Sequence, residues 1–219
     1  LMRLWITILL CLGIISMNTV FVSAEKADRS EFYTYQQMKE ELNQFEVRYP
    51  NLVSVHKLAK TQGGRDILLL EIGKKDIENS KPSMLAVFGQ HADEHETANM
   101  AMSFAKKLLK SYGTDNTLTN MLDNSTVYII PMANPDGIDY DLTSDSTFTT
   151  WRKNRVPTSN GNYGVDLNRN WGYNWDAATT KDVDQKINNP ADEDYHGKNC
   201  FSEIETKSIS KFISRDRKS

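Results

Sequence analysis

A chain of 219 residues with 39% hydrophobic and 25% charged residues has the composition of one ordinary globular domain with a real core. Its formal net charge is −3 and its pI is about 5.9, so it has no basic field of the kind that attracts nucleic acid or an anionic membrane surface. We therefore expect one globular domain with no nucleic-acid partner. We also expect the protein to be a monomer.

Residues 1–24 have the pattern of a secretory signal peptide. A basic start precedes an apolar run over 4–22, and small residues at its end suit cleavage after Ala24. An uncleaved membrane anchor is the alternative, because the apolar run approaches the length that spans a bilayer. Cleavage predicts a secreted chain, 25–219, with no stable membrane span and with Cys200 as its one thiol, so that no internal disulfide can form.

The next elements in chain order are a helix and a pair of strands. Apolar residues at helical spacing predict an amphipathic helix over 33–49. Two apolar segments, 52–55 and 67–72, flank a glycine turn at 62–65 and are expected to be strands. Because their connection is short, these strands should pair antiparallel.

A strand, a helix and a second strand are predicted over 83–89, 94–112 and 126–132. Both strands are continuously apolar, which is typical of strands buried on both faces in the centre of an α/β sheet. This order makes a crossover unit, so the loops after Phe88 and Met132 should meet at the carboxyl ends of the strands. Ligand sites of open α/β sheets lie at that edge.

The stretch 136–199 is rich in Asn, Asp, Ser and Gly and shows little periodicity. Loops of that length are usually functional or disordered, and the three tryptophans in this one supply burial that argues against disorder. The turn residues Asn134 to Gly137 should end the preceding strand sharply. A helical pattern returns from Ser202.

His91 and Glu94 lie directly after the first of the buried strands. An imidazole and a carboxylate three residues apart can bind one zinc ion if the chain turns between the strand and the helix. Two alternatives stay open. The segment is an ordinary polar surface loop, or it forms with His95 a His-x-x-Glu-His motif, in which both histidines bind the metal and Glu94 is the base. That motif requires both histidines on one face of an established helix.

Two arginine-containing strings, 151–155 and 166–170, lie in the long aperiodic stretch. The planar guanidinium of arginine grips a carboxylate with two hydrogen bonds, and a neighbouring amide can add another, so Asn168 and Arg169 suit recognition of a free C-terminus. Arg152 could stabilise an oxyanion. Taken singly, each string also fits a solvated charged loop.

Taken in order, these motifs resemble those of the zinc metallocarboxypeptidases of carboxypeptidase A and carboxypeptidase T type, and they are most similar to bacterial carboxypeptidase T. The matching strings are 91–94, 134–137, 151–155, 166–170 and 195–197 with 201–203, within a resemblance that covers about 33–213. The resemblance implies an α/β fold with a mixed, mostly parallel central sheet flanked by helices. It also implies that 25–219 is the N-terminal two-thirds of a catalytic domain, incomplete at its C-terminal side.

The resemblance further implies a hydrolase with a Zn²⁺ cofactor and a peptide substrate. Its implied roles are zinc binding by His91 and Glu94, support of the His91 ring by Asp166, polarisation of the scissile carbonyl by Arg152, and binding of the terminal carboxylate by Asn168 and Arg169.

The chain also departs from the family pattern. The family's third zinc ligand and general-base glutamate would follow residue 219, and neither His56 nor His196 stands at a ligand position, so we expect this chain alone to be inactive. Asp93 replaces an arginine of carboxypeptidases A and T, as in related peptidases that trim cell-wall peptides. Three functions therefore remain open: a secreted zinc carboxypeptidase, a cell-wall peptide metallopeptidase of the same fold, and a non-catalytic carboxylate-binding module.

Overall fold

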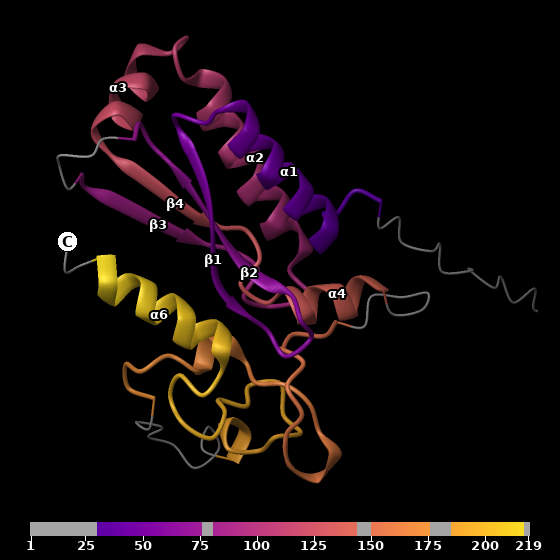
Figure 1. Ribbon diagram of the computed structural model, residues 1–219. Coiled ribbons are helices and arrows are strands. Elements are labelled where there is room, and N and C mark those ends of the chain that lie inside the picture. Colours follow the sequence, from indigo (N-terminus) through magenta and orange to yellow (C-terminus); the bar gives the residue numbers. More distant parts are fainter. Residues whose placement is uncertain (1–29, 76–80, 144–149, 176–184, 217–219) are drawn as a thin grey trace, which may run out of the picture.

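The computed structural model describes residues 30–75, 81–143, 150–175 and 185–216 (Figure 1). The predicted signal peptide at 1–24 lies outside these ranges. In the part of the chain that is described, no helix combines the length and the apolar character needed to cross a bilayer.

Four strands form one sheet in the order β1-β2-β4-β3. They are β1 (Val53–Lys60), β2 (Asp66–Ile72), β3 (Ser83–Val87) and β4 (Thr126–Ile130). β1 and β2 pair antiparallel, as do β2 and β4, whereas β3 and β4 are parallel. The sheet is mixed, as expected. It is not mostly parallel over the described strands, because the short turn after β1 forces a hairpin and a helical crossover joins β3 to β4 alone.

Helices cover both faces of this sheet, with α1 and α2 on one face and α6 on the other (Figure 1). Their bounds are Tyr35–Arg48 for α1, His95–Ser111 for α2, Asn116–Asn124 for α3 and Ile204–Asp216 for α6. α1, α2 and α6 confirm the predicted helices, while α3 was not predicted. Thr34 begins α1 with a capping box, in which its side chain and that of Gln37 each accept a backbone N–H at the helix start.

β2 lies at the centre of the core because its side chains are buried on both faces of the sheet. Leu70 and Ile72 belong to the apolar cluster beneath α1 and α2. Ile67 and Leu69 belong to a second cluster on the opposite face, which includes Ile209 of α6. Full burial of a side chain of this size is worth about 1.5–3 kcal/mol, so both helix layers depend on this one strand.

β3 was expected in the centre of the sheet, but among the described strands it lies at the edge. Its neighbour in the described sheet is β4. At the start of β3, Ser83 is exposed and Met84 is 49% exposed. A continuous apolar run reports that both faces of a strand are apolar. It does not report how many strands flank it, and in the described part of the chain one strand, β4, lies beside β3.

The turn predicted at 134–137 is also the start of a helix, α4 (Pro135–Thr143). Pro135 suits the first helical position, since its missing N–H would have no partner there. The side-chain oxygen of Asn134 accepts the Gly137 N–H at 3.1 Å. A Cβ at Gly137 would come within 2.6 Å of the Lys153 carbonyl oxygen, so glycine is required for this close approach.

Candidate metal and carboxylate site

The crossover brings the loops after β3 and β4 together, as predicted. The N–H groups of Ala133 and Asn134 donate to the carbonyls of Phe88 and Gly89, each at 2.9 Å. Gly89 has a φ of +63°, and a Cβ there would lie 3.0 Å from the Ile138 side chain. This backbone conformation favours glycine, so the segment that carries His91 leaves the sheet in a fixed direction.

Asn134 joins that segment to the arginine-containing loop. Its fully buried amide donates to the carbonyls of Gln90 at 3.2 Å and Lys153 at 3.1 Å. Close by, the Ala92 N–H donates to the Arg152 carbonyl at 3.0 Å. Arg152 is thereby held beside the candidate metal-binding segment. Sequence reasoning treated Asn134 as a turn residue and missed this role, although the matched string 134–137 contained it.

Asp166 is the centre of the candidate site. Its side chain is fully buried, and its Oδ2 lies 2.9 Å from both Nε and Nη2 of Arg152. Its Oδ1 accepts the Asn168 N–H at 2.8 Å and lies 3.3 Å from His91 Nε2. Burial alone would raise the pKa of Asp166, but the contact with His91 and the charge of Arg152 outweigh burial and lower it. The carboxylate is therefore ionised at neutral pH.

His91 is buried between two carboxylates. Its Nδ1 lies 2.9 Å from Oε1 of Glu94, whose side chain is half exposed, and its Nε2 faces Asp166. Asp166 raises the pKa of His91, burial opposes this effect, and Glu94 adds to it. His91 Nδ1 and Glu94 Oε1 thus form an adjacent pair of an imidazole nitrogen and a carboxylate oxygen, while His91 Nε2 is directed at Asp166.

This donor pair fits zinc. Zinc accepts imidazole nitrogen and carboxylate oxygen, and a metal-binding histidine usually directs its second ring nitrogen at a carboxylate, as His91 does toward Asp166. Within the described ranges no group of three His, Cys, Asp or Glu side chains could hold a metal. The described residues thus offer two of the three protein ligands that a catalytic zinc site normally has.

His95 contacts a different partner. It is buried in the first turn of α2, and its Nε2 lies 2.7 Å from Oδ2 of Asp141 on α4. Oδ1 of Asp141 accepts the Trp151 N–H at 2.9 Å. His95 therefore ties α2 to α4, and the structure does not bring it to His91 as a His-x-x-Glu-His metal site would require.

The predicted carboxylate clamp lies on the exposed side of Asp166. Asn168 and Arg169 follow it in a short 3₁₀ turn, Leu167–Arg169, and both are exposed. Nη2 of Arg169 lies 3.2 Å from Oδ1 of Asp194. The structure thus joins these residues to the site through the backbone of the turn, while the Arg169 side chain pairs with Asp194.

A second buried amide, Asn170, supports this turn and was not predicted. Its Nδ2 donates to the carbonyls of His196 at 2.8 Å and Asn199 at 3.0 Å, and its Oδ1 accepts from the Glu203 N–H at 3.2 Å. The turn is therefore fixed to the segment that leads into α6.

The remaining histidines stand apart from this site. The His196 ring stacks on Trp175 with centroids 4.0 Å apart, and its Nε2 lies 3.1 Å from Oδ1 of Asn188. His56 pairs with Glu71 across β1 and β2 at 2.6 Å. Both rings therefore have local partners outside the candidate site. Cys200 is exposed.

Fold and site together define a class: an α/β protein with a zinc-type donor pair at the carboxyl ends of parallel strands and two arginines on the adjoining loops. The family model of zinc carboxypeptidases matches residues 38–219. The chain therefore belongs to the zinc carboxypeptidase family.

Individual relatives agree with this assignment. The zinc carboxypeptidase of Saccharothrix mutabilis subsp. capreolus is 39% identical over 145 residues, which are 66% of this chain and 33% of that protein. Carboxypeptidase A1 of Rattus norvegicus is 32% identical over 193 residues, 88% of this chain and 43% of that protein. The crystal structure of carboxypeptidase A from Helicoverpa armigera has a TM-score of 0.73 at 29% identity, covering 85% of this chain and 43% of that one. The chain thus spans less than half the length of these relatives.

Proposed function

We propose that the whole protein is a secreted, monomeric, zinc-dependent carboxypeptidase that removes C-terminal residues from peptides. The observation that carries this proposal is the contact of one buried carboxylate, Asp166, with both His91 and Arg152, while Glu94 lies against the other ring nitrogen of His91. Membership of the zinc carboxypeptidase family supports it. In this proposal residues 25–219 are the N-terminal part of the catalytic domain.

His91 and Glu94 would hold the zinc ion, which when bound supplies an activated water and a Lewis acid. Asp166 orients both the His91 ring and the Arg152 guanidinium, because its two oxygens face them separately. Arg152 then presents its remaining N–H groups to the oxygen of the scissile carbonyl, where negative charge develops.

Asn168 and Arg169 would bind the terminal carboxylate of the peptide. The exposed Arg169 guanidinium already pairs with one carboxylate, that of Asp194, at 3.2 Å. A substrate carboxylate would replace or share this partner, and its charge-assisted hydrogen bonds would be stronger than neutral ones.

Peptides of the bacterial cell wall are a second candidate substrate. The feature that favours them is Asp93, an exposed acid between the two zinc donors, where relatives of carboxypeptidase A type carry an arginine. An acid there reverses the local charge and, unlike arginine, has no donor with which to hold the carbonyls of an extended peptide. Hydrolysis of a cell-wall cross-link peptide in preference to an ordinary peptide of the same length would favour this candidate.

The decisive test compares one peptide with its C-terminal amide. The whole protein should cleave the free acid about a hundredfold faster, in kcat/KM, because the amide removes the charge that Arg169 binds. A chelator should stop the reaction and zinc should restore it. Equal cleavage of acid and amide would contradict the carboxypeptidase assignment, and binding of the acid without any cleavage would indicate the non-catalytic module.

The zinc assignment is tested by comparing His91→Ala with His95→Ala. The first change should weaken zinc binding about a hundredfold or more, since even loss of a group that supports a ligand costs 10–100-fold. The second should leave zinc affinity unchanged, because His95 contacts Asp141. Competition with a chelating dye measures both. Equal losses of zinc affinity in the two variants would favour the alternative in which both histidines of the His-x-x-Glu-His motif bind the metal.

Secretion rests on the pattern at 1–24. N-terminal sequencing of protein recovered from the growth medium should begin at Glu25. Protein retained in the membrane fraction with segment 4–22 intact would indicate an anchor instead.

A further inference from the structure

A pocket of about 510 Å³ adjoins the candidate site. Arg152 lines it, so the pocket and the site share that side chain. The other lining residues that matter here are Tyr140, Trp151, Arg155, Tyr163 and Glu193. Asn168 and Arg169 are not among the residues that line it. The pocket therefore extends from Arg152 in a direction other than that of the carboxylate clamp.

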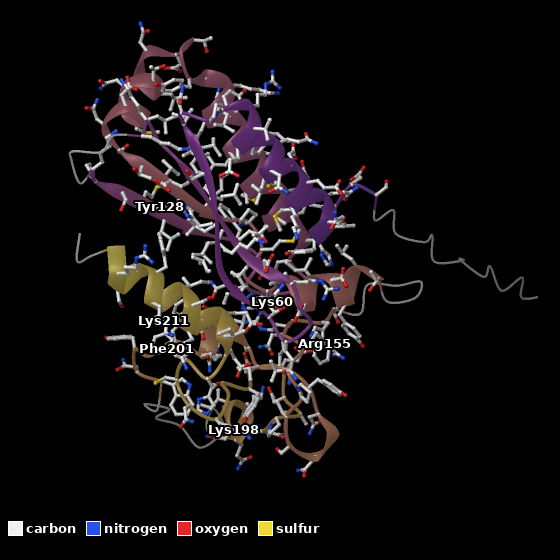
Figure 2. All side chains as sticks on the ribbon, viewed as in Figure 1. Lys60, Tyr128, Arg155, Lys198, Phe201 and Lys211 are labelled. Atoms are coloured by element: carbon white, nitrogen blue, oxygen red, sulfur yellow. The ribbon has the colours of Figure 1, made fainter. Side chains whose placement is uncertain are left out.

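Arg155 is held in this pocket by aromatic rings. Its Cζ lies 3.7 Å from the ring centre of Tyr140, 4.5 Å from that of Trp151 and 4.7 Å from that of Tyr163. Figure 2 places Arg155 beneath α4, beside the loops at that end of the molecule. Rings contact the faces of a guanidinium, whereas its N–H donors lie in its plane and point outward. The rings thus fix the position of Arg155 without satisfying its donors.

The other two cations of the pocket already have partners. Arg152 pairs with Asp166. Lys153 donates from Nζ to two backbone carbonyls, those of Pro190 and Asp192, at 2.8 Å each. Arg155, by contrast, forms no hydrogen bond or ion pair with any other residue of the described ranges, and the lining carboxylate of Glu193 is not paired with it.

The geometry points to a carboxylate subsite at Arg155, occupied by an acidic side chain of the peptide substrate. This inference rests on the proposed function. If Asn168 and Arg169 bind the C-terminus and Arg152 faces the scissile carbonyl, a pocket that shares Arg152 but not the clamp receives residues on the N-terminal side of the scissile bond. A planar guanidinium with free edge donors recognises a carboxylate through two hydrogen bonds.

Matched peptides test this subsite. Each pair has Glu or Gln at one of the three positions before the scissile bond, with the rest of the sequence constant. At one of these positions the ratio of kcat/KM for the Glu peptide to that for the Gln peptide should be about ten, the size expected of one charge-assisted contact. Arg155→Gln should lower this Glu/Gln ratio to about one, and raised ionic strength should reduce it in the unchanged protein.

Two further variants separate recognition from folding. Arg48→Gln removes an equal charge from α1, where Arg48 lies over the Tyr49 ring, and should keep the tenfold ratio. Glu193→Gln removes the acidic lining side chain and should raise the ratio about twofold, which tests the subsite even if Arg155→Gln does not fold. A ratio of one in the unchanged protein, or a ratio that survives Arg155→Gln, would overturn the inference.

Calorimetry distinguishes failure of the subsite from failure of the proposed function. If neither peptide is cleaved, both are titrated into the intact protein. A Glu preference in Kd that Arg155→Gln abolishes would support the subsite and reject the peptidase proposal. Equal Kd values for the Glu and Gln peptides would reject the subsite itself.

Discussion

Asp166 and Glu205 are both buried carboxylates, and their surroundings give them opposite properties. Asp166 lies against Arg152 and His91, and its pKa is lowered. Glu205, in the first turn of α6, is 1% exposed, and its Oε1 accepts one long bond of 3.4 Å from Asn154. Its Oε2 has no hydrogen-bond partner in the described part of the chain. Burial raises the pKa of Glu205 to about 7.

The comparison teaches that burial does not by itself decide whether a carboxylate is charged. The contacts with His91 and Arg152 outweigh the effect of burial on the pKa of Asp166, whereas for Glu205 the negative charges of Glu203 and Asp136 raise the pKa further. In the candidate site the fold therefore keeps a buried carboxylate, Asp166, in its charged form. Removing each carboxylate should then have effects of opposite sign.

The largest effect is expected for Asp166→Asn. The change leaves Arg152 and His91 beside a neutral amide in a buried site, and breaking a buried ion pair in this way costs about 3–5 kcal/mol. Urea unfolding at pH 7 measures the loss in the free energy of unfolding. A loss below about 1 kcal/mol would show that the ion pair behaves like an exposed one and would remove the contrast with Glu205.

A somewhat smaller effect is expected on catalysis by the two arginines of the proposed site. Arg152→Ala should mainly lower kcat, because its target oxyanion exists only during the reaction, whereas Arg169→Ala should mainly raise KM, because a terminal carboxylate is present throughout. Each loss should be about 2–4 kcal/mol. Steady-state kinetics of the whole protein measures both, and an identical split for the two variants would contradict the separate roles.

Glu205→Gln should stabilise the protein as the pH rises. A carboxyl whose pKa is raised in the folded state favours folding most below its unfolded pKa, and this contribution is lost as the pH rises through the folded value of about 7. Relative to the unchanged protein, the Gln variant should therefore gain about 3 kcal/mol between pH 4.5 and pH 8. Paired urea titrations at the two pH values measure this gain. A variant less stable at pH 8 would show that Glu205 is ionised with a favourable partner.

The sequence predicts those parts of the fold and site that depend on local pattern. An apolar strand, a helix and a second apolar strand are readable from the pattern over 83–89, 94–112 and 126–132. This order predicts the crossover that brings the loop carrying His91 to the loop carrying Asn134. The family resemblance then assigns His91, Glu94, Arg152 and Asp166, and the structure brings these four together.

The rest depends on contacts between segments far apart in the chain. Asn134, Asn154 and Asn170 have the sequence character of turn residues, yet each is a fully buried amide that joins loops. Their roles depend on carbonyls and carboxylates that fall within reach only after folding. Glu205 shows the same limit, because its position in a first helical turn is typical of a solvated acid.

The smallest effect is expected for Asp194→Asn, which breaks the exposed ion pair between Asp194 and Arg169. Both side chains are more than a third exposed, so the pair is screened by water and the free energy of unfolding should change by less than about 1 kcal/mol. The freed guanidinium should bind a terminal carboxylate more readily, lowering KM about twofold at low salt, with the difference vanishing at 1 M salt. Kinetics at both salt concentrations measures this. A raised KM would instead show that Asp194 holds Arg169 in its binding orientation.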